Sequence, residues 1–113
     1  MSKVLERLRK KHGNAVEING ETFNVRSLTI GELRRLDKIE ADQKTGFVIG
    51  CALCSDENGT QELPQAEGET DALWSERVLT ELADVETETI RALSDGVAKI
   101  GRTPKAETIV KNC

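Results

Sequence analysis

Two cysteines with a C-x-x-C spacing, Cys51 and Cys54, come closest to a chemical motif in this chain. Such a pair can act as a redox couple or supply half of a zinc site. A zinc site needs about four ligands, and the other candidates, His12 and Cys113, stand near opposite ends of the sequence. A thioredoxin-like pair follows a strand at the start of a helix, whereas these cysteines end an apolar run that we expect to be helical. The sequence therefore predicts buried reduced thiols, with no metal and no cofactor.

Oxygen-bearing side chains are frequent over residues 56–62, Asp-Glu-Asn-Gly-Thr-Gln-Glu, and this resembles a calcium loop. An EF-hand loop places glycine at its sixth position and a bidentate glutamate at its twelfth. Here Gly59 is fourth, and the twelfth residue, Glu67, lies in a different context. The spacing predicts a turn rather than a cation site.

Motifs for nucleophilic or nucleotide chemistry are missing from the sequence. His12 is the single histidine, and no Gly-x-Ser-x-Gly, P-loop or Gly-x-Gly-x-x-Gly pattern occurs. Carboxylate pairs such as Glu86 and Glu88 are two residues apart and do not share a helix face. We therefore expect a protein that is not an enzyme.

The composition is that of one globular domain. The chain has 113 residues, of which 37% are hydrophobic and 32% charged, enough for a single core. An aromatic content of 3% argues against a stacking surface for single-stranded nucleic acid. No apolar run approaches the roughly 20 residues that span a bilayer, and the basic start of the sequence lacks the apolar stretch of a signal peptide. We expect a cytoplasmic protein that binds neither nucleic acid nor membrane.

Charge is unevenly divided along the chain. Residues 1–55 hold ten Lys or Arg against seven Asp or Glu, residues 56–90 hold one against eleven, and residues 91–113 hold five against two. The net charges of the three segments are therefore +3, −10 and +3. An acidic middle segment suits a basic partner or a neighbouring copy of the chain. The alternative is a solvated acidic loop with helix faces that keep the domain soluble.

A β-hairpin is predicted over residues 15–26. Asn19-Gly20 is the strongest short hairpin signal because both residues tolerate the positive φ of a type I′ turn. Apolar residues alternate around this turn, at Val16, Ile18, Phe23 and Val25. We expect these four side chains to pack on helices, because an isolated two-stranded hairpin is marginally stable in water.

Helical patterns account for most of the remaining chain. They predict a short basic helix within residues 1–14, then helices over residues 30–41, 42–54, 71–82 and 85–100, with a flexible tail over residues 102–113. Residues 55–70 are predicted to form the one long loop. The predicted fold is α+β and mostly helical: a single domain over residues 15–101 with its hairpin packed on a bundle of four to five helices.

The helix over residues 30–41 begins at a capping box, because Thr29 precedes Glu32 by three residues. Its apolar residues recur every three positions, which predicts one buried stripe and an opposite exposed side. The predicted buried residues are Ile30, Leu33, Leu36 and Ile39, and the predicted exposed residues are Glu32, Arg34, Arg35 and Lys38.

A short hairpin, the run Arg26-x-Leu28-Thr29-x-x-Glu32, and an apolar helix that ends at an Asp56-x-x-Gly59 turn follow one another in this sequence. This order of elements, over about residues 15 to 100, resembles the tail assembly chaperones of long-tailed bacteriophages. The resemblance implies a non-enzymatic factor that coats the tail tape measure protein, keeps it soluble and hands it over to major tail tube subunits. It also implies a location in the host cytoplasm, absence from the mature virion and possible self-association.

The partner-binding residues that we predict are apolar anchors on the helices over residues 42–54 and 71–82: Phe47, Ile49, Leu53 and Trp74. The alternative is that all four lie in the domain's own core. Two other functions stay open, a structural tail component such as a tube or completion protein, and a small regulatory or DNA-binding domain that uses Arg34, Arg35 and Lys38.

Overall fold

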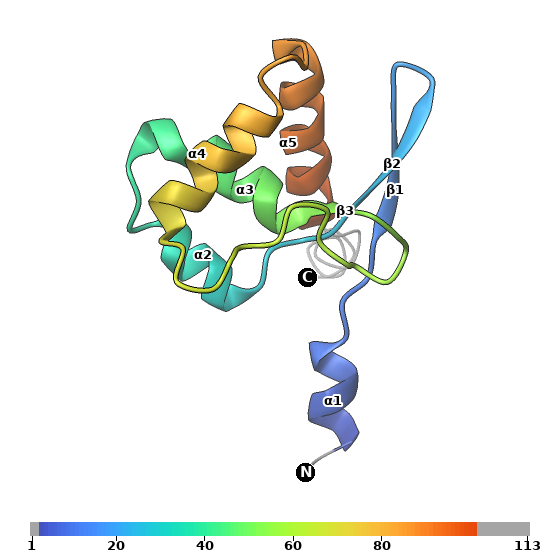
Figure 1. The fold of residues 1–113 in the computed structure, drawn as a ribbon. Helices are drawn as coiled ribbons and strands as arrows, with labels where there is room; N and C mark the ends of the chain where they lie inside the picture. Colours follow the sequence, from blue (N-terminus) through green and yellow to red (C-terminus); the bar gives the residue numbers. More distant parts are fainter. Residues whose placement is uncertain (1–2, 102–113) are drawn as a thin grey trace, which may run out of the picture.

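A computed structural model describes residues 3–101, which form an α+β domain of five α-helices and one three-stranded antiparallel sheet (Figure 1). The elements in chain order are α1 (Lys3–Arg9), β1 (Asn14–Ile18), β2 (Glu21–Val25), α2 (Ile30–Leu36), a 3-10 turn (Ala41–Gln43), α3 (Lys44–Ala52), β3 (Leu53–Cys54), α4 (Asp71–Glu81) and α5 (Thr87–Gly101). The predicted fold class is confirmed. The predicted tail over residues 102–113, with Cys113, lies outside the described residues.

The predicted hairpin is present within one residue of its expected bounds. β1 and β2 pair antiparallel with Val16 opposite Phe23, and the turn residues Asn19 and Gly20 have φ values of 54° and 80°. Both φ values are positive, as a type I′ turn requires. Ile18 and Val25 are buried, and Val16 and Phe23 are partly buried against the same core cluster. The hairpin therefore packs on the helices as expected.

The helix predicted over residues 42–54 is wrong at both ends. Residues 41–43 form a 3-10 turn, α3 begins at Lys44, and Leu53 and Cys54 form the short strand β3. β3 pairs with β2, where Leu53 lies opposite Val25 and Cys54 opposite Asn24. An apolar run is compatible with helix or strand, and here the unpaired edge of β2 takes up its last two residues.

The other helices keep their predicted order with shifted ends. α2 ends at Leu36 rather than at residue 41. α4 is capped by the Thr70 side chain, which accepts a hydrogen bond from the Leu73 N–H. α5 begins at Thr87, two residues later than predicted. Its apolar residues are spaced by three, four and three positions and form one stripe, with Leu93 and Val97 buried and Ile90 and Ile100 partly buried.

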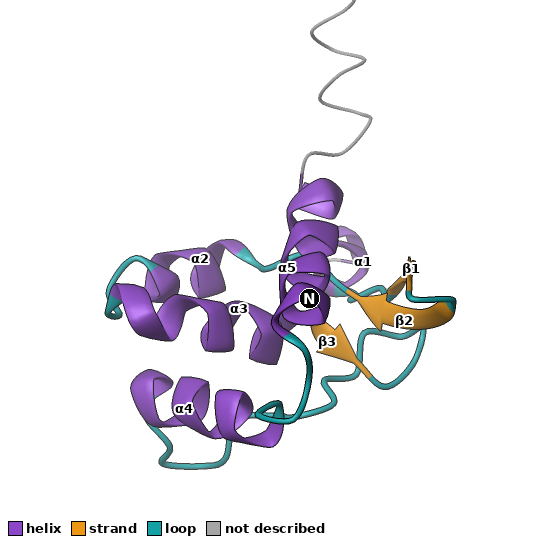
Figure 2. Ribbon diagram, turned by 90° about the horizontal axis from the view of Figure 1, so that it is seen from above, coloured by secondary structure: helices purple, strands orange, loops and turns teal. Residues whose placement is uncertain are grey.

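Helix α3 lies at the centre of the domain. Figure 2 shows α3 between α2 and α4, with α5 and the sheet at the end of α3 where the chain enters β3. Two clusters of buried side chains surround it. The first lies under the hairpin and consists of Ile18, Val25, Ala52, Leu93 and Val97. The second lies against α4 and consists of Phe47, Ile49, Cys51, Trp74 and Val78. α3 contributes residues to both.

Candidate functional site

Three of the four predicted partner anchors lie in the second core cluster. Phe47, Ile49 and Trp74 are at most 1% exposed. The Phe47 and Trp74 rings meet edge to face with centroids 5.5 Å apart, and Trp74 Nε1 donates a hydrogen bond to the Leu63 carbonyl at 2.8 Å. Leu53 is partly buried in β3. On the folded domain these three side chains do not form part of the surface, because α3 and α4 turn them toward one another.

An apolar groove lies elsewhere, between α2, α3 and α5. It has a volume of about 400 Å³. Its lining residues are Ser27, Leu28, Leu33, Leu36, Lys44, Thr45, Val48, Ser94, Val97 and Ala98. Six of these ten side chains are aliphatic, and Lys44 carries the single charge. Such a surface can hold aliphatic side chains of a partner and offers few groups for acid–base chemistry.

Helix α2 extends the apolar surface beyond the groove. Ile30 is 71% exposed and Leu33 is 49% exposed, so the predicted buried stripe is wrong at these two positions. The cause is the orientation of α2, because Glu32 faces inward to meet a buried arginine. Residues two apart on a helix point in nearly opposite directions, so an inward Glu32 turns Ile30 toward solvent.

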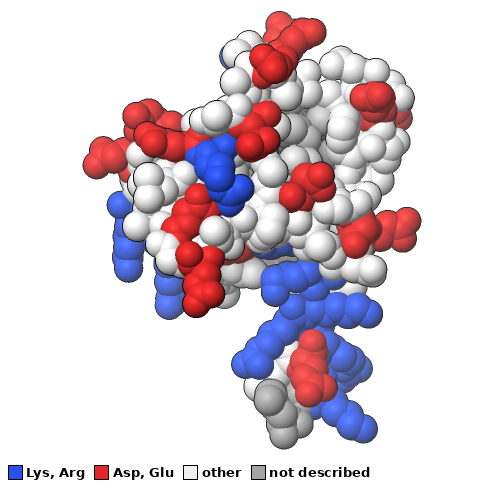
Figure 3. Space-filling model, in the orientation of Figure 1, with Lys and Arg blue, Asp and Glu red and all other residues white. Residues whose placement is uncertain are grey.

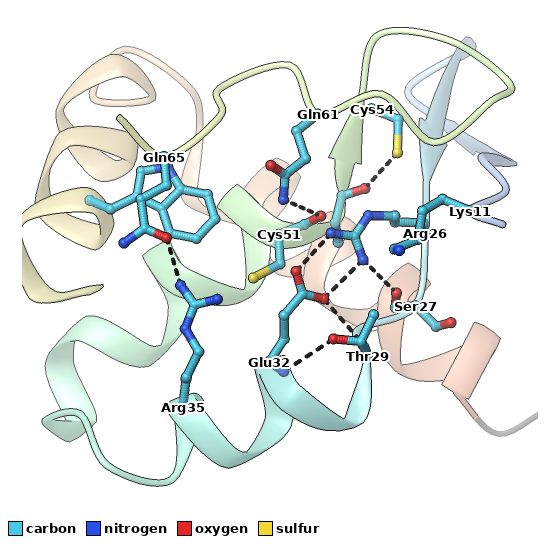
Figure 4. Close-up of polar contacts among 12 residues, drawn as sticks. Lys11, Arg26, Ser27, Thr29, Glu32, Arg35, Cys51, Cys54, Gln61 and Gln65 are labelled. Atoms are coloured by element: carbon cyan, nitrogen blue, oxygen red, sulfur yellow. Dashed lines mark hydrogen bonds and ion pairs between the residues drawn. The ribbon is translucent and has the colours of Figure 1, made fainter. Parts of the chain in front are cut away.

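The buried arginine is Arg26, whose side chain is 6% exposed and forms a two-point ion pair with Glu32. Arg26 Nη1 donates to Glu32 Oε1 at 2.9 Å and Nη2 donates to Oε2 at 2.8 Å (Figure 4). Glu32 Oε1 also accepts from the Thr29 N–H, and Thr29 Oγ1 accepts from the Glu32 N–H, which completes the predicted capping box. The Arg26-x-Leu28-Thr29-x-x-Glu32 run thus orients α2.

Burial of the Glu32 carboxylate opposes its charge, but the hydrogen bonds from Arg26 and from the Thr29 N–H outweigh this effect. The pKa of Glu32 is therefore lowered from its ordinary value. The same hydrogen bond with Glu32 raises the pKa of Arg26 despite burial. Both side chains stay charged at neutral pH, as an ion pair that holds α2 in place.

Cys51 and Cys54 are both buried and reduced. Burial is the main cause that raises the pKa of the Cys51 thiol far above its ordinary value, and burial also raises the pKa of Cys54. Cys54 Sγ donates to the Ala52 carbonyl at 3.1 Å. Cys51 is in the last turn of α3 and Cys54 is in β3, so the pair does not lie at the start of a helix as a thioredoxin-like couple would. The prediction of buried thiols is confirmed.

Arg35, predicted to be exposed, instead joins α2 to α4. It donates to Asp71 through Nε and Nη2, and Nη2 also donates to Gln65 Oε1 at 2.6 Å. Its guanidinium lies over the Phe47 ring, 5.1 Å from the centroid, a distance at which a cation is attracted to the ring face. The hydrogen bond from Arg35 is the main cause that lowers the pKa of Asp71.

The loop over residues 55–70 is tied to the body at several points. Asp56 Oδ1 accepts hydrogen bonds from the Asn58 and Thr60 N–H groups, so the predicted turn is confirmed. Arg77 donates to Glu69 and to the Pro64 carbonyl. The last part of the acidic loop is therefore linked to α4 through Arg77.

A second hollow, also of about 400 Å³, lies where the segment after α1 meets the start of α2. Lys10, Lys11 and Arg26 bring positive charge to its lining. The charge of Arg26 is balanced by Glu32. The apolar groove is therefore the stronger candidate for a binding site.

No family model, curated protein or solved structure matches the chain. Within residues 3–101, no helix is long and apolar enough to cross a membrane. In the same part of the chain, no group of three or more His, Cys, Asp or Glu side chains is placed to hold a metal ion.

The sequence patterns did not reveal the groove, because the groove depends on how α2 is rotated about its own axis. The signal was present in the Arg26-to-Glu32 spacing, since an arginine just before a capping box can reach its carboxylate. That pairing is visible only when the strand before α2 is known to bury Arg26.

Proposed function

We propose that this chain is a phage tail assembly chaperone that binds an apolar helical segment of the tape measure protein in the groove between α2, α3 and α5. The observation that carries the proposal is the apolar lining of this groove together with the exposure of Ile30 and Leu33 beside it. Apolar grooves of this kind receive one face of an amphipathic helix, whose side chains enter at helical spacing. The phage assignment itself rests on the resemblance of the sequence.

Binding without catalysis fits the chemistry of the described residues. The buried charges at Arg26 and Glu32 neutralise each other, and burial disfavours the thiolate of Cys51. A chaperone of this kind works through repeated weak apolar contacts, and the acidic exterior of the complex keeps it in solution. The chain would act in the host cytoplasm, pass the tape measure protein to the major tail tube protein, and leave before the virion is complete.

The test is a pull-down and a solubility assay with a purified tape measure fragment. The wild-type chain should retain the fragment and keep it soluble. Leu33→Asp should weaken retention about tenfold or more, because a charge would face an apolar groove that cannot solvate it. Leu33 is half exposed, so the variant should still fold, which circular dichroism verifies.

Ala83→Asp is the control, because Ala83 is exposed in the turn after α4 and does not line the groove. It adds the same charge and should bind as the wild type does. Failure of the wild type to hold the fragment would refute the proposal, and normal binding by Leu33→Asp would refute the groove as its site.

The alternative, a structural tail component, differs from a chaperone in where the protein is found. Antibody detection should find the chaperone in extracts of infected cells and not in purified particles. A structural component would be found in both. The DNA-binding alternative loses one of its residues, because Arg35 is engaged by Asp71 and Gln65.

A further inference from the structure

Helix α1 and the segment after it carry a dense positive charge. Residues 3–12 contain Lys3, Arg7, Arg9, Lys10 and Lys11 against a single carboxylate, Glu6. All of these side chains are exposed. Figure 3 shows the basic side chains gathered on this helix, below a body on which acidic side chains predominate.

The same helix also presents apolar side chains to solvent. Val4, Leu5 and Leu8 are 53%, 45% and 74% exposed, and no residue of α1 is buried. Figure 1 shows that α1 stands away from the rest of the domain, joined to it by a short segment. A seven-residue helix is marginally stable alone, so this surface gains most from contact with another molecule.

The complementary surface lies on α4 and the loop before it. Glu67, Glu76 and Glu81 are exposed there. Leu73, 57% exposed, lies among them on α4, one turn before Glu76. This surface, called here the acidic face, thus combines carboxylates with an apolar side chain, as α1 combines cations with leucines.

Within one molecule the two surfaces do not meet. Figure 1 shows α1 below the body of the domain and α4 at its upper left, well separated from each other. The segment after α1 is held in place, because the Gly13 N–H donates to the Glu57 carbonyl at 2.8 Å. The acidic face that α1 can reach therefore belongs to another molecule.

We propose that α1 of one copy docks on the acidic face of a second copy, with its basic side chains beside the glutamates and its leucines beside Leu73. The two patches differ, so the contact can repeat from copy to copy. The groove between α2, α3 and α5 takes no part in it, and the contact therefore stands or falls independently of the proposed function.

The test is a charge exchange followed by sedimentation or by light scattering during gel filtration. One variant carries Lys3→Glu and Arg7→Glu on α1, and the other carries Glu67→Lys and Glu76→Lys on the acidic face. The wild-type chain should associate at low ionic strength. Its dissociation constant should rise by about tenfold or more as added salt screens the charges. Each variant alone should be monomeric, because the first has no net positive charge left on residues 3–12 and the second has no net negative charge left on the acidic face.

Mixing the two variants should restore association, since α1 is unchanged in the second variant and the acidic face is unchanged in the first. Arg34→Glu with Lys38→Glu is the control for the first variant, because it makes the same change of net charge at exposed positions in α2 and in the turn after it. Glu17→Lys with Glu21→Lys on the hairpin is the control for the second. Both controls should associate as the wild type does.

A wild-type chain that stays monomeric at low salt would overturn the proposal. Variants that associate as the wild type does would also overturn it. So would a mixture that fails to associate although circular dichroism shows that each variant is folded. Binding of α1 to an anionic polymer such as heparin, with no association of the chain itself, would overturn it in favour of a different partner.

Discussion

At the scale of single residues, Arg26 and Glu32 form a charged pair in a place where apolar side chains are usual. Their side chains are 6% and 12% exposed. Removing two charges from water is costly, and the cost is offset only when both partners are present with good geometry. Arg26 Nε has no hydrogen-bond partner among the described residues. The pair therefore contributes less net stability than its short distances suggest, but loss of one member leaves the other charge stranded.

We expect Arg26→Met to lower the free energy of unfolding by about 3–5 kcal/mol, because Glu32 would be left as a nearly buried charge without its partner. Urea unfolding followed by circular dichroism measures this change. Arg26→Met with Glu32→Gln should cost less than the sum of the two single changes. Additive losses would show that the two side chains do not interact.

The same pair predicts how stability depends on pH. The pKa of Glu32 is lower in the folded chain than its ordinary value of 4.5, so around that pH the unfolded chain binds more protons. Stability should therefore rise with pH through this range, be fully present above about 4.5 and be lost as pH falls through the folded pKa. Urea unfolding from about pH 7 to about pH 3 should show a stability difference between wild type and Glu32→Gln that narrows on acidification. A constant difference would contradict the assignment.

At the scale of elements, local chemistry was sufficient for the hairpin and for the presence of the helices. Asn19-Gly20 encodes its own turn, and the stripe through Leu93 and Val97 encodes the buried side of α5. The strand β3 depends instead on the free edge of β2, which is distant in sequence. The rotation of α2 depends on Arg26, and with it the groove. The sequence pattern could not specify these two features, because one needs the edge of β2 and the other needs the burial of Arg26 at the end of β2.

The contact between α3 and α4 depends on glycine. A Cβ added at Gly50 would lie 2.9 Å from Trp74 Cζ2 and 3.0 Å from Val78 Cγ2. Gly50→Ala should therefore destabilise the domain by about 1–3 kcal/mol, because the two helices would have to separate. Gly31→Ala on α2 is the matched control, since its added Cβ meets nothing closer than Thr29 Oγ1 at 3.8 Å.

The control should leave stability unchanged or raise it by up to about 1 kcal/mol through helix propensity. Thermal unfolding of both variants measures the contrast. Equal effects of the two substitutions would show that helix propensity, and not the approach of α4, governs position 50.

At the scale of the whole molecule, the two core clusters share helix α3. Ala52 belongs to the cluster under the hairpin, whereas Phe47, Ile49 and Cys51 belong to the cluster against α4. Leu28 and Leu53 pack against both clusters. A change in one cluster should therefore reach the other through a single short helix, and the domain should unfold in one cooperative transition.

Leu93→Ala tests this coupling, because Leu93 belongs to the hairpin-side cluster and Trp74 to the other. The substitution should lower the free energy of unfolding by about 2–5 kcal/mol. Trp74 is the only tryptophan, so its fluorescence reports on the α4 side, whereas circular dichroism reports on all helices. Both signals should shift to the same lower urea midpoint. If the fluorescence midpoint stayed at the wild-type value while circular dichroism shifted, the clusters would unfold separately, and α3 would not transmit a change under the hairpin to the packing of α4.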